Sequence, residues 1–238
     1  MFKRMSALLW LRLQIIFSNK SILLQILMPF GFVYFYKYLL DTQGGGGDQQ
    51  ALLLLATCLP FSLVMAVGNP ITVIMSEEKE KGNLRTLLMS GVKGYEYLIS
   101  TLILPIFLTL IVMGMVPLIL GISINNLLNY SVIVLMTSIV IILFYLFLGL
   151  VTRSQVEAQI ISIFAMLLVA FSPMVANLDK SMAKFVDYSF MGLFTEYVTK
   201  WDRFSWGETI QPSFSLVSWG VLLIICIFWV IKKKHRIY

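Results

Sequence analysis

One stretch of this sequence, from Ser131 to Val151, contains no charged side chain at all. A helix needs about 20 consecutive apolar residues to cross the hydrocarbon core of a bilayer, and this stretch is long enough. The whole chain has the same character: 59% of its residues are hydrophobic, 13% are charged, and its mean hydropathy is +0.88. A soluble domain carries about 25% charged residues. The sequence therefore predicts an integral membrane protein of the all-α class.

Five further apolar runs, each bounded by charges, glycine or asparagine, bring the number of predicted transmembrane helices to six. The predicted spans cover residues 21–40, 52–75, 97–121, 129–151, 157–175 and 213–232. They leave little chain outside the membrane, so we expect one polytopic transmembrane domain over 1–238. Both cysteines, Cys58 and Cys226, fall inside predicted spans, which favours buried thiols over a disulfide.

The lysines and arginines predict the orientation of the chain. With both termini in the cytoplasm, most of the 18 Lys and Arg residues face inward, including those of the loop between spans two and three. This agrees with the positive-inside rule. The formal net charge of +6 is therefore a topology signal, and no separate basic domain suggests nucleic acid as a partner. The amino terminus lacks the cleavage pattern of a signal peptide, so we expect a multi-pass protein with an uncleaved amino terminus.

The segment 1–20 has a helical pattern of its own. Apolar residues recur along it at spacings of three or four, at Phe2, Met5, Leu9, Leu13 and Ile16. Lys3 and Arg4 lie on the opposite face. This pattern predicts an amphipathic helix that lies in the inner headgroup layer. The alternative is a plain cytoplasmic extension of the first span.

The segment 76–91, between spans two and three, concentrates charge in an otherwise apolar chain. Ser76 is a candidate N-cap, and the acidic residues after it would suit the first turn of a helix. Gly82 interrupts this turn, a second short helix follows, and Gly91 is a candidate C-terminal stop. The orientation argument places the whole segment in the cytoplasm.

The second short helix of this segment carries Leu84, Leu87 and Leu88 on one face. Two helical turns are not stable alone in water, so these leucines need a surface to pack against. That surface is the membrane, the rest of the chain or a partner protein. A charged hairpin that only holds two spans in register is the alternative to partner docking, and the residues alone do not separate the two.

The run "EEKEKGNLRTLLMSGVKGYEYLISTL" resembles the cytoplasmic loop of ABC type-2 permeases, the membrane subunits of a class of bacterial ABC exporters. The resemblance covers nearly the whole chain: the amphipathic amino-terminal segment, six spans, the turn "LGLVTRSQVEAQ" and a long outer segment before span six. No single motif in it is as specific as a Walker sequence, but their order and spacing agree. One departure is Gly91-Val92, where the family often has a proline.

The resemblance implies that the loop is a coupling helix that docks into a groove on a separate ATPase subunit. Acidic residues would meet polar or basic groups of the ATPase, and leucines would fill the groove. The docking residues carried over are Glu77, Glu78, Glu80, Gly82, Leu84, Arg85, Leu87 and Leu88. The resemblance also implies two ATPase subunits, which hold ATP and Mg²⁺, and a homodimer or a heterodimer with a related permease in the lipid bilayer. No cofactor is expected on this chain itself.

The segment 176–211 is too charged to span and too aromatic for a floppy loop. Aromatic residues of this kind favour the membrane–water boundary. The resemblance implies two short re-entrant helices that cover the exit of a substrate path, and an aromatic anchor loop is the alternative. The run "GGGGDQQ" in the other outer loop lacks the Gly-Lys-Ser/Thr ending of a phosphate loop, which favours a flexible linker.

Few polar residues lie inside the predicted spans, and such residues often face a bundle interior or a pathway. The pathway candidates are Thr57, Ser62, Asn69 and Ser162. Asn69-Pro70 predicts a kink in span two, while helix–helix hydrogen bonding is the alternative role for the hydroxyl groups. A path without charges suits amphipathic or hydrophobic cargo.

The sequence contains no Walker A motif and no nucleophile or metal-ligand constellation, so we expect a transport subunit that is not itself an enzyme. The leading hypothesis is an ATP-driven exporter of a peptide toxin, bacteriocin or drug. The runner-up is a membrane immunity or scaffold protein that binds a peptide without transporting it. A secondary transporter comes third, because neither intramembrane acidic residues nor a repeat is evident.

Overall fold

The computed structural model describes residues 2–42, 48–92, 94–124, 126–176 and 179–235. Within these ranges the only regular secondary structure is helical. The elements are α1 (Phe2–Ser18), α2 (Lys20–Thr42), α3 (Asp48–Leu63), the π-helix η1 (Val64–Gly68), α4 (Asn69–Glu80), α5 (Asn83–Met89), α6 (Gly94–Leu120), α7 (Leu127–Val151), α8 (Gln155–Ala176), α9 (Lys180–Asp187), α10 (Gly192–Thr199) and α11 (Ile210–His235). The predicted all-α class is confirmed. Residues 44–47 of the glycine-rich run lie outside the described residues.

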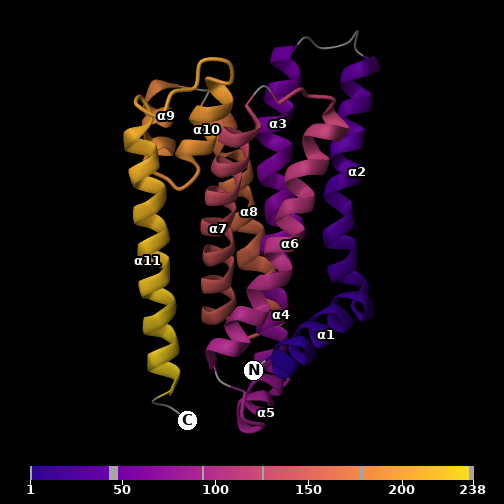
Figure 1. The fold of residues 1–238 in the computed structure, drawn as a ribbon. Helices are drawn as coiled ribbons and strands as arrows, with labels where there is room; N and C mark the ends of the chain where they lie inside the picture. Colours follow the sequence, from indigo (N-terminus) through magenta and orange to yellow (C-terminus); the bar gives the residue numbers. More distant parts are fainter. Residues whose placement is uncertain (1, 43–47, 93, 125, 177–178, 236–238) are drawn as a thin grey trace.

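Six helices are long and apolar enough to cross a membrane, as the sequence predicts. They are Lys20–Thr42, Gln50–Glu80, Glu96–Leu120, Leu127–Val151, Gln155–Ala176 and Ile210–Lys232. The second span is composite, because α3, η1 and α4 continue one another (Figure 1). The remaining helices α1, α5, α9 and α10 are shorter and lie at the two ends of the bundle.

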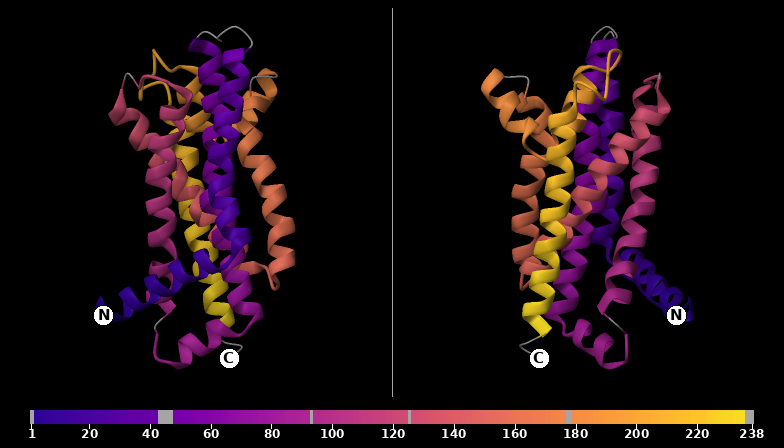
Figure 2. Two further views of the ribbon diagram at one scale, coloured as in Figure 1. Left: turned by 90° about the vertical axis from the view of Figure 1, so that its right-hand side faces the viewer. Right: turned by 60° about the vertical axis from the view of Figure 1, so that its left-hand side comes forward.

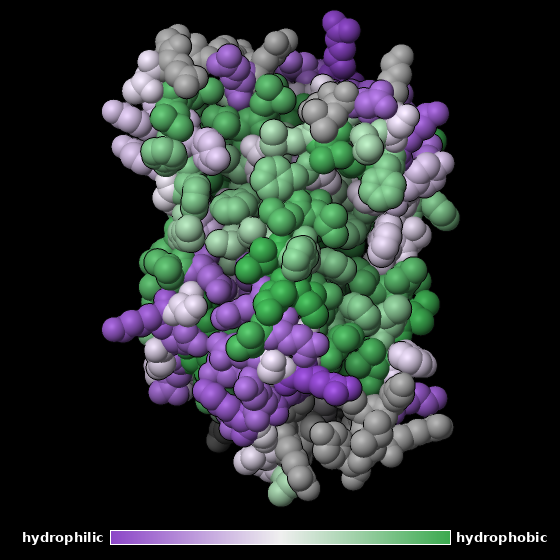
Figure 3. Space-filling model, turned by 180° about the vertical axis from the view of Figure 1, so that it is seen from behind, coloured by the Kyte–Doolittle hydropathy of each residue, from purple (hydrophilic) through white to green (hydrophobic). Residues whose placement is uncertain are grey.

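Both chain ends lie near the same end of the bundle, together with α5 (Figure 1). We call this end the α5 end and the opposite one, which carries α9 and α10, the α10 end. The helix α1 runs at an angle to the spans, and its amino-terminal part projects sideways (Figure 2). Figure 3 shows an apolar band across the middle of the rear face, with hydrophilic residues toward both ends. This banding is expected for a protein that spans a bilayer.

The helix α7 packs closely against α4 and η1 because small residues line the contact. A Cβ on Gly149 would lie 3.1 Å from the Cα of Thr72, and a Cβ on Gly68 would lie 2.7 Å from the ring of Tyr145. Thr72 Oγ1 donates a 2.8 Å hydrogen bond to the carbonyl of Tyr145 across the same contact. Small side chains and interhelical hydrogen bonds are the usual means by which membrane helices associate.

Aromatic residues build a packed cap at the α10 end. The rings of Tyr197 and Trp201 have centroids 5.1 Å apart, and Phe204 lies at the same distance from Tyr197. The indole of Trp206 donates a 3.1 Å hydrogen bond to Asn129 Oδ1, at the start of α7. The segment 176–211 therefore contains two short helices, α9 and α10. The re-entrant placement that the resemblance implies stays a prediction.

Span two is irregular at the predicted kink site. The π-helix η1 ends directly before Asn69, and Pro70 occupies the first turn of α4, where its missing N–H is tolerated. The kink itself stays a prediction. In α1, the face toward the bundle carries Leu8, Arg12 and Ile16, whereas Leu13, on the predicted apolar face, is exposed. The prediction that α1 lies in the headgroup layer stays a prediction.

Candidate functional site

The second span continues past the predicted membrane boundary and carries polar residues into the protein interior. The helix α4 runs unbroken to Glu80, so the predicted helix start at Ser76 is wrong. Ser76 and Glu78 are buried. Acidic residues at the carboxyl end of a helix face the negative end of its dipole, so each needs a partner. The partners of the buried Ser76 and Glu78 come from α1, α6 and the α7–α8 turn.

Glu78 forms a buried ion pair with Arg12 of α1. The exposed fractions of the two residues are 3% and 4%. Arg12 Nη1 bonds to Glu78 Oε1, and Arg12 Nη2 donates a 2.9 Å hydrogen bond to Thr101 Oγ1 of α6. Tyr97 donates a 2.6 Å hydrogen bond to Glu78 Oε2, and its ring centroid lies 4.9 Å from Arg12 Cζ. We call Arg12, Glu78, Tyr97 and Thr101 the arginine network.

The arginine network ties together three segments that are distant in the sequence. Its carboxylate and guanidinium each have more than one partner, as a buried charge pair requires. Removing one member of such a pair leaves the other charge buried without compensation, at a cost of about 3–5 kcal/mol. The network therefore fixes α1 and α6 against the end of α4.

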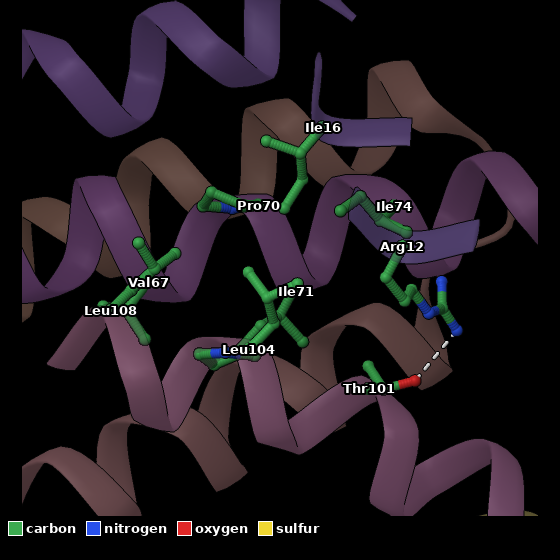
Figure 4. Close-up of a pocket in the computed structure, with 10 residues that line it drawn as sticks. Arg12, Ile16, Val67, Pro70, Ile71, Ile74, Thr101, Leu104 and Leu108 are labelled. Carbon is green, nitrogen blue, oxygen red and sulfur yellow. Dashed lines mark hydrogen bonds between the residues drawn. The ribbon is translucent and has the colours of Figure 1, made fainter. Parts of the chain in front are cut away.

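A mainly apolar pocket adjoins the arginine network (Figure 4). Arg12 and Thr101 are its polar residues, and their hydrogen bond lies at one end of it. The other lining residues are Ile16, Val67, Pro70, Ile71, Ile74, Leu104, Pro105 and Leu108. Apolar walls lower the local dielectric and strengthen the electrostatic attraction between the two charges of the network.

On its other side, α4 is bound to the α7–α8 turn. Lys79 Nζ donates hydrogen bonds to the carbonyls of Gly149, Leu150 and Thr152, the one to Leu150 being 3.2 Å long. The hydroxyl oxygens of Ser76 and Thr152 lie 2.6 Å apart. We call this set of contacts, with the bond from Glu80 described next, the lysine clamp.

Glu80 Oε2 accepts a 2.7 Å hydrogen bond from the main-chain N–H of Gln155, in the first turn of α8. The first N–H groups of a helix have no partner within it, so a carboxylate satisfies one of them well. The lysine clamp thus binds the carboxyl end of α7 through a cation and the amino end of α8 through an anion. Both charges come from the last turn of α4.

The helix α5 is set off by two glycines with positive φ. Gly82, at φ +71°, turns the chain between α4 and α5, and Gly91, at φ +86°, ends α5. The N–H of Val92 bonds to the carbonyl of Leu87 at 3.3 Å, which is the outer bond of a Schellman motif. The prediction that Gly91 stops this helix is confirmed, and the motif closes without the proline common in the family.

The predicted docking residues do not share one surface. Glu78 is buried in the arginine network, and Leu87 packs in part against the hydrophobic core of the chain itself. Glu77 pairs with Lys81, and this hydrogen bond raises the pKa of Lys81. Glu80 and Gly82 are exposed. The side chains of Leu84, Arg85 and Leu88 lie outside the described part of the chain.

Met89, on α5, is 76% exposed, and sequence reasoning did not single it out. Sequence reasoning also missed Arg12, although the sequence contains a pattern that could have identified it. Arg12 lies four residues from both Leu8 and Ile16, so it interrupts a buried stripe of α1 with a charge. A charge in that position calls for a buried partner of opposite sign.

The four pathway candidates lie within or against the packed bundle. Thr57 and Ser62 hydrogen-bond to carbonyls of their own helix, Ser62 to Cys58 at 2.7 Å. Asn69 Nδ2 lies 3.4 Å from the sulfur of Met65. Among the described residues, Asn69 Oδ1 and Ser162 Oγ are buried without a hydrogen-bond partner. No group of metal-ligating side chains occurs within the described ranges.

Comparison with known proteins identifies the family. Neither the curated proteins nor the solved structures that were searched gave a match. A family model described as "ABC-2 family transporter protein" matches residues 12–231, which include both the arginine network and the lysine clamp. Because this match covers nearly the whole chain, the protein belongs to the ABC-2 transporter family and is a multi-pass membrane permease.

Proposed function

We propose that this permease is the membrane subunit of an ATP-driven exporter and that α5 is its coupling helix. The observation that carries the proposal is the position of α5. It is a separate short helix at the tip of the α5 end, attached to the second span by the Gly82 turn (Figure 1). The sequence has no Walker A motif, so the ATP and Mg²⁺ would be held by partner subunits.

The docking surface is the exposed part of α5 and of the turn before it. Asn83, Thr86, Met89 and Ser90 are exposed there, next to the exposed carboxylate of Glu80. A short helix that presents such a surface suits a groove on a partner, which is the helix-in-groove mode of recognition. Glu78 and Leu87 would act from behind this surface, by holding α4 and α5 in place.

The α5 end faces the cytoplasm in this proposal. Both chain ends lie there, and the basic residues of the 76–91 segment favour that side by the positive-inside rule. The helix α1 would then lie in the inner headgroup layer of a bacterial plasma membrane. Its exposed Trp10, Leu13 and Phe17 would contact lipid. The helices α9 and α10 would cover the outer side.

Two permease copies, or this chain and a relative, would form the path between them, and two ATPase subunits would drive it. Few charged side chains occur in the spans, which suits amphipathic or hydrophobic cargo such as a toxin peptide, a bacteriocin or a drug. Closure of the ATPase pair would displace α5, and α4 would carry this displacement into the bundle.

A pair of methionine substitutions tests the coupling role. Met89→Asp places a charge on the exposed face of α5, and Met182→Asp makes the same change on the exposed face of α9, where Met182 is 47% exposed. We expect the tagged wild-type chain and the Met182→Asp variant to recover an ATP-hydrolysing subunit from the native membrane. The Met89→Asp variant should recover little of it and should fail to export hydrophobic dyes that the wild type exports. Unimpaired recovery and export by Met89→Asp would refute the docking surface.

A further inference from the structure

We infer that Lys79 is a positioning residue that makes α4, α5 and the α7–α8 turn one mechanical unit, so that a displacement of α5 moves α7 and α8. This inference rests on the proposed function, because it names the helices to which the coupling helix would pass its motion. The α7–α8 residues involved, 149–155, do not belong to the proposed docking surface.

The ammonium group of Lys79 lies at the carboxyl end of α7, where each of its donors has an acceptor. An ammonium group has three donors, and here it meets three carbonyls of residues 149–152. The last carbonyls of a helix lack partners within it and carry partial negative charge. Lys79 thus binds two of the last carbonyls of α7, those of Gly149 and Leu150, and the carbonyl of Thr152, which follows the helix.

Two further bonds bring α8 into the same unit. The Ser76–Thr152 contact of 2.6 Å holds the first residue after α7, and the 2.7 Å bond from Gln155 N–H to Glu80 holds the first turn of α8. All the α4 residues involved lie between 76 and 80, and Lys79 and Glu80 are within one helical turn of the Gly82 turn into α5. A movement of α5 therefore has a short path to α7 and α8.

The helices α4 and α7 also pack closely enough that a displacement of one moves the other. A Cβ on Gly149 would lie 3.1 Å from Thr72 Cα and 3.2 Å from Met75 Cβ, so the two helix backbones meet with almost no side chain between them. One turn further into the bundle, Thr72 bonds to the carbonyl of Tyr145 at 2.8 Å. Closely packed helices move as rigid bodies and do not deform continuously.

Two adjacent residues of α4 therefore bind two different groups of helices. Glu78 binds α1 and α6 through the arginine network, and Lys79 binds α7 and α8 through the lysine clamp. A displacement of α5 passes to α7 and α8 through the lysine clamp and not through the arginine network. Loss of Lys79 should therefore uncouple α8 from a displacement of α5 and leave α5 able to bind its partner.

The test measures the distance between α5 and α8 with spin labels at the exposed positions Met89 and Val156. The labelled chain is diluted into unlabelled chain, so that pairs within one copy dominate. We compare the wild type with Lys79→Met, with the conservative Lys79→Arg, and with Lys81→Met as the matched control. Lys81 is an exposed lysine two residues away that pairs with Glu77 within α4.

In the permease alone, the wild type, Lys79→Arg and Lys81→Met should give a narrow distance distribution, and Lys79→Met should broaden it. In the complex with the recovered ATPase, all four should still bind the ATPase and hydrolyse ATP. In undiluted chain labelled at the exposed Val156 alone, the ATP-driven shift of the distance between the labels of the two permease copies should be lost only in Lys79→Met.

A narrow distribution and an unchanged ATP-driven shift in Lys79→Met would overturn the inference. Broadening in Lys81→Met as well would also overturn it, because the effect would not be specific to the clamp. Failure of the proposed function has a different signature, since the wild-type chain would then recover no ATPase at all, whereas the distances in the permease alone would still depend on Lys79.

Discussion

The buried ion pair between Arg12 and Glu78 makes a quantitative prediction about stability. Both side chains are almost fully buried, and apolar residues wall one side of the pair. Arg12→Met leaves the Glu78 carboxylate without a cation, and Glu78→Met leaves the guanidinium without an anion. Tyr97 and Thr101 are neutral and supply one hydrogen bond each, so neither can replace the lost charge. Each single variant should lose about 3–5 kcal/mol of unfolding free energy.

The double variant Arg12→Met/Glu78→Met should be more stable than either single variant. It removes both charges together, and replacing a buried pair by apolar residues of similar volume is often neutral or stabilising. The remaining cost is the Tyr97 hydroxyl, which loses its acceptor, at about 1–3 kcal/mol. The two substitutions should therefore be strongly non-additive, as expected for residues in direct contact.

The assay is denaturant unfolding of the detergent-solubilised chain, with all variants in one detergent. Glu77→Met and Lys81→Met provide the matched control, because they remove a similar ion pair at the surface of the same helix turn. Exposed pairs contribute little, so these controls should unfold with the wild type. The reasoning is refuted if the buried single variants each cost less than about 1 kcal/mol, or if their effects simply add in the double variant.

Two further predictions concern other parts of the chain. Gly68→Ala should destabilise the bundle by about 1–3 kcal/mol, because the new Cβ would lie 2.7 Å from the ring of Tyr145, whereas Gly31→Ala, with nothing within 4 Å, should be neutral in the same unfolding assay. Burial, together with the negative charge of Glu196, raises the pKa of Asp187. Stability is therefore lost as the pH rises from about 3.9, the ordinary carboxyl pKa, through the raised value. Asp187→Asn should raise the unfolding midpoint at pH 7, and this gain should shrink toward pH 4. An equal gain at both pH values would contradict the argument.

The six spans follow from the sequence because their signal is local. An apolar run of sufficient length has few alternatives to a transmembrane helix, as Ser131–Val151 shows. The boundaries are less predictable where charges near a span find partners elsewhere. Span two was expected to end near residue 75, yet it continues to Glu80. Its charged residues are paired within the protein and do not form a solvated loop.

The candidate site illustrates the same limit. The partners Arg12 and Glu78 are 66 residues apart in sequence, and Lys79 and Thr152 are 73 apart. No local pattern links them, because the pairing depends on how the helices pack. The sequence did predict the stop at Gly91. It could not tell that the acidic residues divide between an internal network and an exposed surface.

The pathway candidates show what a polar residue in a span can and cannot indicate. Ser62 is buried and bonds to a carbonyl of its own helix, which supports a structural role. Asn69 and Ser162 are buried with side-chain atoms that have no partner among the described residues. In a dry interior such atoms are costly, so these two positions are the better candidates for a role beyond packing.

The central claim is that a second subunit drives this permease through α5, and site-specific photo-crosslinking tests it most directly. A photoreactive amino acid replaces Met89 in one sample and Met182 in another, and each full-length chain is irradiated in its native membrane. The account predicts a crosslink at position 89 to a subunit that binds ATP, and none at position 182. An absence of any crosslink at position 89, or an equal crosslink at both positions, would contradict it.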